Sequence, residues 1–262
     1  MIVDTHCHIN TKAFDQDLNE VIKRAIELDV SKMIVVGMDS YHNDKTIELI
    51  ETYDGLYGAI GIHPCDVEHA DFNAIIPLLD HKKVVAVGET GIDLYWDKTN
   101  LDKQKAYFIK HIEISIKYNL PLIIHTRDSF NEAYEIIKPY KGKVKGVFHA
   151  FSSSLEDALK VIDLGLYIGI GGVVTFPKAE TLKEIVKHIS LDHMLLETDS
   201  PYLTPVPFRG KRNEPGYTKY VCEMVGKIKD VSSEVVAKTT SDNAHKLFGL
   251  EQKIWKKYGF LH

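Results

Sequence analysis

The sequence predicts an α/β fold with a parallel sheet. Short apolar runs alternate with amphipathic segments from one end of the chain to the other, which is the pattern of repeated β-α units. The apolar runs are nearly continuous Val, Ile and Leu, as in 34–36 and 122–124, and this indicates strands that are buried on both faces. No Gly-x-Gly-x-x-Gly follows the first strand, so a dinucleotide-binding sheet lacks its fingerprint.

Taken in order, the apolar runs predict eight strands, each followed by a helix. The predicted strands are 2–5, 33–37, 56–62, 84–88, 120–124, 144–148, 166–170 and 194–197. The predicted helices are 18–28, 43–53, 72–79, 102–118, 130–138, 155–164, 180–189 and 217–229. Eight such units fit a closed TIM (β/α)8 barrel better than an open sheet, and 232–247 forms an additional C-terminal helix. We expect one domain over residues 1–262, with the glycines of 169–172 allowing close backbone approach at a strand end.

Composition excludes several classes of protein. The formal charge is -5, with 37 acidic against 32 basic residues, which argues against coating nucleic acid through bulk positive charge. No apolar stretch approaches the roughly 20 residues that span a bilayer, and no N-terminal segment has the pattern of a signal peptide. The three cysteines have no paired spacing. We therefore expect a cytoplasmic protein without membrane contact and infer no obligate protein partner.

The histidines and acids fall at the carboxyl ends of the predicted strands, where barrel enzymes gather their chemistry. Side chains two apart on a strand share a face, so His6 and His8 converge after the first strand. Four further residues end strands four, five, six and eight: Glu89, His125, His149 and Asp199. One such residue is as easily a solvated polar side chain as a ligand, but six at one end predict a metal site.

Six nitrogen and oxygen ligands exceed what one tetrahedral ion requires and suit a pair of divalent ions. Glu89 lies between the two groups of histidines in barrel order and is the natural bridge, while Asp199 completes one ion. Strand alternation directs Cys7 into the barrel wall, so we expect no thiolate among the converging ligands. Imidazole and carboxylate together accommodate Mg, Mn or Zn.

In its motifs the chain resembles the TatD family of metal-dependent deoxyribonucleases, which belong to the amidohydrolase-like barrels. The matching motifs are 4–8 (DTHCH), 61–64 (GIHP), 88–93 (GETGID), 125–127 (HTR), 149–152 (HAFS), 197–203 (ETDSPYL), 209–215 (RGKRNEP) and 243–248 (NAHKLF). The resemblance implies one ion held by His6, His8, Glu89 and Asp199, and a second held by Glu89, His125 and His149. Cys65 departs from the family, where many relatives carry histidine, which puts a substrate contact from that position in doubt.

The resemblance further implies a DNA substrate, attacked in single-stranded form or from a 3′ end. The mechanism that we expect is hydrolysis of the phosphodiester by a metal-bound hydroxide, with Glu89 bridging the ions and Asp199 orienting the attacking water or accepting its proton. No Gly-x-Ser-x-Gly elbow supports a nucleophilic side chain.

A second tier of residues carries weaker predictions. His63 ends strand three and is a candidate substrate contact, or else makes a structural hydrogen bond. Glu197 shares a strand face with Asp199 and is a candidate partner for a ligand histidine. Arg127 is predicted to hold the scissile phosphate, with a salt bridge at a helix start as the alternative. The remaining candidates for binding substrate lie in one basic loop: Arg209, Arg212 and Asn213.

Three aromatic residues in predicted loops have two possible roles. Tyr95, Trp96 and Phe208 either stack on unpaired bases or pack on their own protein.

The sequence also leaves two competing functions open. An amidohydrolase-like deacylase or esterase, acting on a carboxyl ester or amide such as an aminoacyl-tRNA, is the alternative enzyme. Relatives of that kind often bridge their ions with a carboxylated lysine on strand four, where this chain has Glu89. A metal-binding module without activity is a third possibility, against which the complete ligand set argues.

Overall fold

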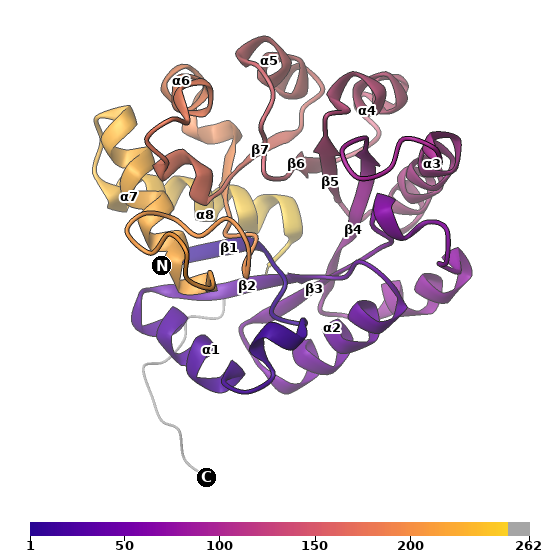
Figure 1. Cartoon of the computed structure of the whole chain (residues 1–262), viewed down its shortest axis with the longest axis horizontal. Coiled ribbons are helices and arrows are strands. Elements are labelled where there is room, and N and C mark those ends of the chain that lie inside the picture. Colours follow the sequence, from indigo (N-terminus) through magenta and orange to yellow (C-terminus); the bar gives the residue numbers. More distant parts are fainter. Residues whose placement is uncertain (251–262) are drawn as a thin grey trace.

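In the computed structural model, which describes residues 1–250, eight parallel strands form one sheet in sequence order. Helices surround this sheet (Figure 1). The strands are β1 (Ile2–Cys7), β2 (Val30–Val36), β3 (Leu56–Ile60), β4 (Val84–Asp93), β5 (Leu122–Arg127), β6 (Gly146–Phe148), β7 (Tyr167–Ile170) and β8 (Met194–Leu196). All eight predicted strands are present, and the TIM barrel fold is confirmed. Residues 251–262 of the predicted domain lie outside the described residues.

The end of the chain's last strand closes the barrel on its first. The backbone N–H of Asp199 donates to His6 O at 2.9 Å, and that of His8 donates to Ser200 O at 2.7 Å. Cys7 and Ser200 form a parallel bridge between these two segments. Asp4 adds side-chain bonds by accepting from the backbone N–H and the hydroxyl of Thr198, at 2.9 and 2.6 Å. Closure therefore places residues from both ends of the sequence side by side.

Seven helices follow strands as predicted, within a few residues of the expected bounds. They are α1 (Leu18–Glu27), α2 (Ser40–Thr52), α3 (Leu101–Tyr118), α4 (Phe130–Ile137), α5 (Leu155–Asp163), α6 (Glu180–His188) and α7 (Thr218–Lys229). The segment predicted as a helix at 72–79 is instead a 3₁₀ helix, η3 (Phe72–Asp80). Pro77 lies inside it, and proline removes an N–H and clashes with the preceding turn of an α-helix.

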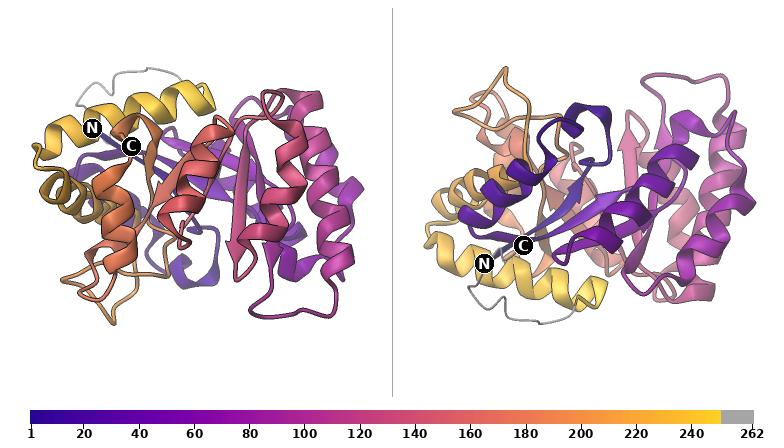
Figure 2. Two further views of the ribbon diagram at one scale, coloured as in Figure 1. Left: turned by 90° about the horizontal axis from the view of Figure 1, so that it is seen from above. Right: turned by 90° about the horizontal axis from the view of Figure 1, so that it is seen from below.

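The additional helix α8 (Ser233–Phe248) covers the amino ends of the strands. Asn243 donates to Leu191 O and Met194 O at the start of β8, at 2.8 and 2.9 Å, and the Ser241 hydroxyl donates to Met1 O. Both views of Figure 2 show α8 beside the N-terminus. Leu247 and Phe248 pack with buried strand residues. The opposite end of the barrel, formed by the carboxyl ends of the strands, is left for the site.

Close backbone approach explains the glycines at 169–172. A Cβ on Gly169 would stand 2.9 Å from His149 Cα, and one on Gly172 would stand 2.1 Å from Leu203 O. The expectation from the sequence is confirmed at these two positions. None of the helices within residues 1–250 has both the length and the apolar character that crossing a membrane requires.

Candidate metal centre

The structure brings all six predicted ligands together at the carboxyl ends of the strands. His6 lies in β1 and His8 follows it, Glu89 lies in β4 and His125 in β5, and His149 and Asp199 follow β6 and β8. Glu89 is buried at the middle of the group, and its side chain touches all four histidines. The convergence inferred from strand ends is therefore present in the fold.

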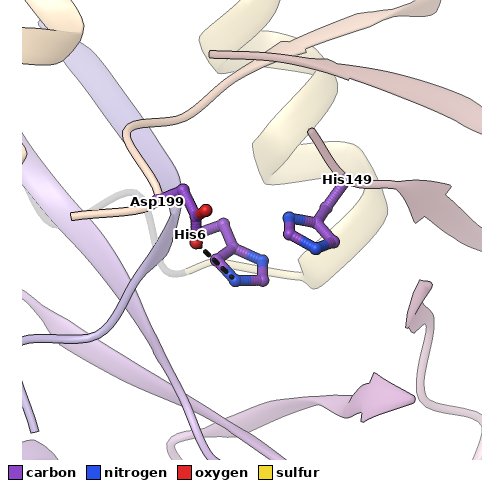
Figure 3. Close-up of side chains that lie close together, drawn as sticks. All are labelled: His6, His149 and Asp199. Carbon is purple, nitrogen blue, oxygen red and sulfur yellow. Dashed lines mark ion pairs between the residues drawn. The ribbon is translucent and has the colours of Figure 1, made fainter. Parts of the chain in front are cut away.

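Four of these side chains form the first set of ligand atoms: His6 Nε2, His8 Nε2, Glu89 Oε2 and Asp199 Oδ1. The two histidine nitrogens are 3.0 Å apart. Glu89 Oε2 lies 3.4 and 3.5 Å from them, and Asp199 Oδ1 lies 3.6 and 3.4 Å from them. Ligands around a tetrahedral ion at about 2.0–2.1 Å stand roughly 3.3–3.4 Å apart. The set has the spacing of a four-coordinate metal site, and Figure 3 shows Asp199 facing His6.

The other oxygen of the same carboxylate belongs to a second set of ligand atoms. Glu89 Oε1 lies 2.9 Å from His125 Nδ1 and 2.8 Å from His149 Nε2, and these two nitrogens are 3.3 Å apart. His63 Nε2 approaches the same oxygen at 3.5 Å. The ring of His149 also stacks on that of His6, with centroids 3.9 Å apart (Figure 3). One carboxylate thus faces both sets, each with a different oxygen.

Hydrogen bonds on the far side of the rings orient two of the histidines. His8 Nδ1 donates to Val36 O at 3.0 Å, so Nε2 is the nitrogen that faces the first set and that would bind an ion after losing its proton. His125 Nε2 donates to Asp93 Oδ2 at 2.8 Å, which leaves Nδ1 toward Glu89. Carboxylates and carbonyls in this position fix the ring and raise the basicity of a metal ligand.

The sequence analysis assigned no role to Asp93, although it could have been found. Asp93 lies four residues after Glu89 on the same strand, so alternation places both on one face. Gly91 between them makes room for this arrangement, because a Cβ there would stand 2.0 Å from His125 O.

Glu197 lies behind His149, but the predicted hydrogen bond to a ligand histidine is not formed. Its Oε1 accepts from the backbone N–H of Ala150 and stands 3.7 Å from His149 Nδ1. Within the described residues, the buried atoms His149 Nδ1, Glu197 Oε2 and His6 Nδ1 have no hydrogen-bond partner. Buried polar atoms are rarely left in this state. These three atoms lie close to Glu89, whose carboxylate is surrounded by five histidine rings. Such a group of buried polar atoms is consistent with a metal-binding site.

The charges of the centre are strongly coupled. Burial opposes ionisation of Glu89, but the surrounding histidines outweigh it and hold the pKa of that carboxyl well below its usual value. Burial alone would lower the pKa of His8, but hydrogen bonds with Asp199 and Glu89 outweigh it and raise the pKa to about 10. Burial lowers the pKa of His63 to about 3, so this ring is neutral. The carboxylates are therefore ionised at neutral pH, as metal ligands must be.

A third cluster at the same mouth contains a cysteine. Cys65, His63 and Asp93 each offer a ligand atom within 4.8 Å of the others. The partial desolvation of Cys65 and the nearby Asp93 raise the pKa of its thiol to about 12, so Cys65 is a thiol rather than a thiolate at neutral pH. Cys7, in contrast, is buried in the wall as predicted, with its thiol donating to Ile34 O at 3.4 Å.

Two of the residues predicted to bind substrate have other partners. Arg212 donates to Asp17 at 2.7 Å and to Glu214 at 3.1 Å, and its guanidinium also stacks over Phe14. Asn213 is buried, and its amide donates to Thr198 O and to Tyr202 O. Both side chains hold the loop after β8 in place, so their contacts do not support a role in binding substrate.

The remaining two arginines are exposed at the mouth. The Arg209 guanidinium stacks on Phe176 with its Cζ 3.6 Å from the ring centroid, and Arg127 stacks on Tyr95 at 3.8 Å. Phe208 instead packs on its own protein, with its ring parallel to that of Tyr217 at 4.5 Å. Tyr95 and Trp96 are exposed at the mouth, and so is Tyr202, whose ring centroid lies 6.4 Å from that of His8.

A cavity of about 190 Å³ opens beside the first set of ligands. Asp199 and Glu197 lie on its wall together with Phe151, Val173 and Lys178. The centre is therefore buried on the barrel side and accessible from this cavity.

The chain is similar to proteins that are named as metal-dependent hydrolases. Residues 3–249 match the family model described as TatD related DNase. The chain is 44% identical over 252 residues to the uncharacterized metal-dependent hydrolase YabD of Bacillus subtilis, covering 95% of this chain and 99% of that protein. It is 35% identical over 255 residues to YcfH of Escherichia coli K12, named in the same way, covering 95% and 96%. The crystal structure of YjjV, a TatD homolog from Escherichia coli K12, superposes with a TM-score of 0.89 at 29% identity, covering 95% and 98%.

Proposed function

The chain belongs to the TatD-related DNase family, a group of metal-dependent hydrolases within the amidohydrolase superfamily, and from this premise we propose that it hydrolyses phosphodiester bonds in DNA. The observation that carries the proposal is the carboxylate of Glu89, whose two oxygens face two separate sets of ligand atoms. A carboxylate placed in this way suits a pair of divalent ions, which is the arrangement that clamps the attacking and leaving oxygens of a phosphoester.

The proposed ligands divide between the two ions. His6, His8, Glu89 and Asp199 hold one ion, and Glu89, His125 and His149 hold the other. Mg, Mn and Zn all accept this donor set of imidazoles and carboxylates. When bound, the ions supply an activated water and neutralise the negative charge that builds up on the phosphate.

Asp199 has the proposed role of handling the proton. Its Oδ1 faces His6 and His8, and its side chain borders the cavity, so Oδ2 is the atom that accepts a proton from the attacking water. The pKa of Asp199 lies below its usual value because the hydrogen bond with His8 and the nearby histidines outweigh the effect of burial. The carboxylate is therefore ionised and ready to accept at neutral pH.

His63 and the two exposed arginines are the proposed contacts to the DNA backbone. His63 Nδ1 accepts from the backbone N–H of Cys65 at 3.1 Å, so the proton of the neutral ring is on Nε2, which points into the centre. A phosphate oxygen bound there receives this hydrogen bond. Arg127 and Arg209 add positive charge at the mouth of a chain whose overall charge is -5. Local rather than overall charge thus binds the DNA, which we propose to be single-stranded or a 3′ end.

The test compares DNA with a carboxyl ester. Purified protein is incubated with labelled single-stranded DNA and with a generic carboxyl ester, each with Mg, Mn or Zn and then with a chelator. We expect metal-dependent cleavage of DNA, and Asp199→Asn should remove most turnover while the fold is kept. Asp163→Asn, which changes an exposed ion pair with Lys141, is the matched control and should retain activity. Cleavage of the ester but not of DNA would overturn the proposal in favour of a deacylase or esterase.

A further inference from the structure

Two large aromatic side chains lie exposed beside the metal centre. Tyr95 is 53% exposed and Trp96 is 69% exposed, and both belong to the loop that directly follows β4. Their rings meet edge to face with centroids 4.9 Å apart. Neighbouring exposed aromatics of this size are a common sign of a binding surface.

The loop that presents them is held in one conformation. Asp93 Oδ1 accepts from the backbone N–H groups of both Tyr95 and Trp96, at 2.9 and 3.0 Å. The buried side chain of Gln104 donates to Asp93 O and to Asp97 O, at 3.0 and 3.2 Å. The aromatic pair is therefore ordered before any ligand binds, and binding to it loses little conformational entropy.

A cation completes the group. Arg127 lies opposite Asp93 on the neighbouring strand β5, and its guanidinium Cζ is 3.8 Å from the Tyr95 ring centroid and 5.4 Å from that of Trp96. Among residues 1–250, the Arg127 guanidinium has no hydrogen-bond or ion-pair partner. Stacking thus fixes its plane and leaves its N–H groups free for an anion.

The group is joined directly to the proposed metal ligands. Asp93 contacts the aromatic loop through Oδ1 and His125 through Oδ2, and His125 contacts Glu89. The same carboxylate thus holds both the loop that carries Trp96 and a proposed metal ligand.

We propose, as an extension of the proposed function, that Tyr95, Trp96 and Arg127 form a stacking platform for single-stranded DNA. An unpaired base stacks on the exposed ring of Trp96, and Arg127 binds the adjoining phosphate. Stacking on aromatic side chains suits any base, because every base has a π-face. Bases inside a duplex are already stacked on both sides, so the platform selects single strands and frayed ends.

The test measures binding in the presence of a chelator, so that cleavage plays no part. Fluorescence of Trp96 is followed in a Trp255→Phe background, because the chain has two tryptophans and Trp255 lies outside the described residues. A short oligothymidylate should quench this fluorescence, whereas a blunt duplex should not. Anisotropy of a labelled oligothymidylate should show about tenfold weaker binding for Trp96→Ala. Trp96→Phe, which keeps a π-face, should retain most of the affinity.

The arginine is tested by salt dependence. Each phosphate neutralised on a single strand contributes about 0.7 to the slope of log affinity against log salt. Arg127→Gln should reduce that slope by about 0.7, and Trp96→Ala should leave it unchanged. The control is Tyr41→Ala, another exposed aromatic at 52%, whose ring contacts His42 and has no arginine on it. It should bind as the parent does.

The outcomes separate the platform from the proposed function. Quenching and tenfold weaker binding without any DNA cleavage would retain the platform and overturn the nuclease. Cleavage of DNA with equal affinity in the parent and in Trp96→Ala would overturn the platform and retain the nuclease. Equal losses in Trp96→Ala and Tyr41→Ala would also overturn the platform, since any exposed aromatic would then serve.

Discussion

Replacing Asp93 with Asn should weaken metal binding at the second set of ligands through the tautomer of His125. In the parent protein, Asp93 Oδ2 accepts from His125 Nε2 at 2.8 Å, so in the neutral ring Nδ1, which faces Glu89, is the nitrogen with the lone pair that would bind an ion. Asp93 Oδ1 accepts two backbone N–H groups, from Tyr95 and Trp96, so the oxygen of an Asn must remain there. The amide NH₂ then faces Nε2. The ring responds by moving its proton to Nδ1, the atom that would bind the ion.

The size of the effect follows from this single contact. Removing the carboxylate partner of a ligand histidine typically costs 10–100-fold in metal affinity or activity. This loss corresponds to about 1.4–2.7 kcal/mol. The parent contact is short and charge-assisted, and with an ion on Nδ1 the variant would place Nε2–H against the amide NH₂, two donors, so we expect a loss near the upper end.

The assay is competition for Zn or Mn against a chromophoric chelator, followed by the rate of DNA cleavage at saturating metal. Asp97→Asn is the control, because Asp97 lies in the same loop and, within residues 1–250, its side chain accepts only from Thr99. Binding of oligothymidylate in chelator should be the same in all three proteins, since the bonds from Asp93 Oδ1 are kept. Equal metal affinity in the parent and in Asp93→Asn would refute the tautomer argument.

Two further predictions follow from the charged groups. The pKa of His8 is about 10 in the metal-free protein, above its ordinary value of 6.5, so its contribution to stability is fully present below pH 6.5 and is lost as pH rises through 10. Metal binding must remove that proton, so apparent affinity should rise about tenfold per pH unit between pH 7 and 9, and calorimetry in buffers of different ionisation enthalpy should detect the released proton. An affinity independent of pH would contradict this. Arg212→Met should lower the free energy of unfolding by about 1 kcal/mol, because it breaks the ion pairs with Asp17 and Glu214, and should leave the salt dependence of DNA binding unchanged. A smaller slope of log affinity against log salt in Arg212→Met would instead indicate that Arg212 contacts DNA.

The convergence of the six ligands could be predicted because it depends on strand ends alone. Once 84–89 and 120–125 are recognised as parallel strands, the barrel places Glu89 and His125 at one mouth whatever their sequence separation. The alternation of side chains along a strand also placed Cys7 in the wall and Glu197 behind the ligands. These inferences needed no knowledge of loop conformation.

What the sequence could not predict concerns side chains whose partners lie in loops. Arg212 was predicted to contact substrate, and the sequence did not reveal its partner Asp17, which lies 195 residues earlier in a loop that strand periodicity does not place. Asn213 satisfies backbone carbonyls of the loop after β8, which the sequence does not reveal. The prediction of an α-helix at 72–79 was wrong for a different reason. Its apolar periodicity favoured an α-helix, but Pro77 within the segment is a local signal against one.

The two sets of ligands depend on the fold in different ways. Glu89, His125 and His149 come from β4, β5 and the end of β6, which are consecutive strands paired in order. His6 comes from β1 and Asp199 follows β8, the first and last strands of the sheet, and they meet where Asp199 N donates to His6 O as β8 closes on β1. An ion bound by the first set would therefore favour the closed barrel, and its binding free energy would add to the stability of that closure. Glu89 belongs to both sets, so it would couple the closure of the barrel to the geometry of the proposed second ion.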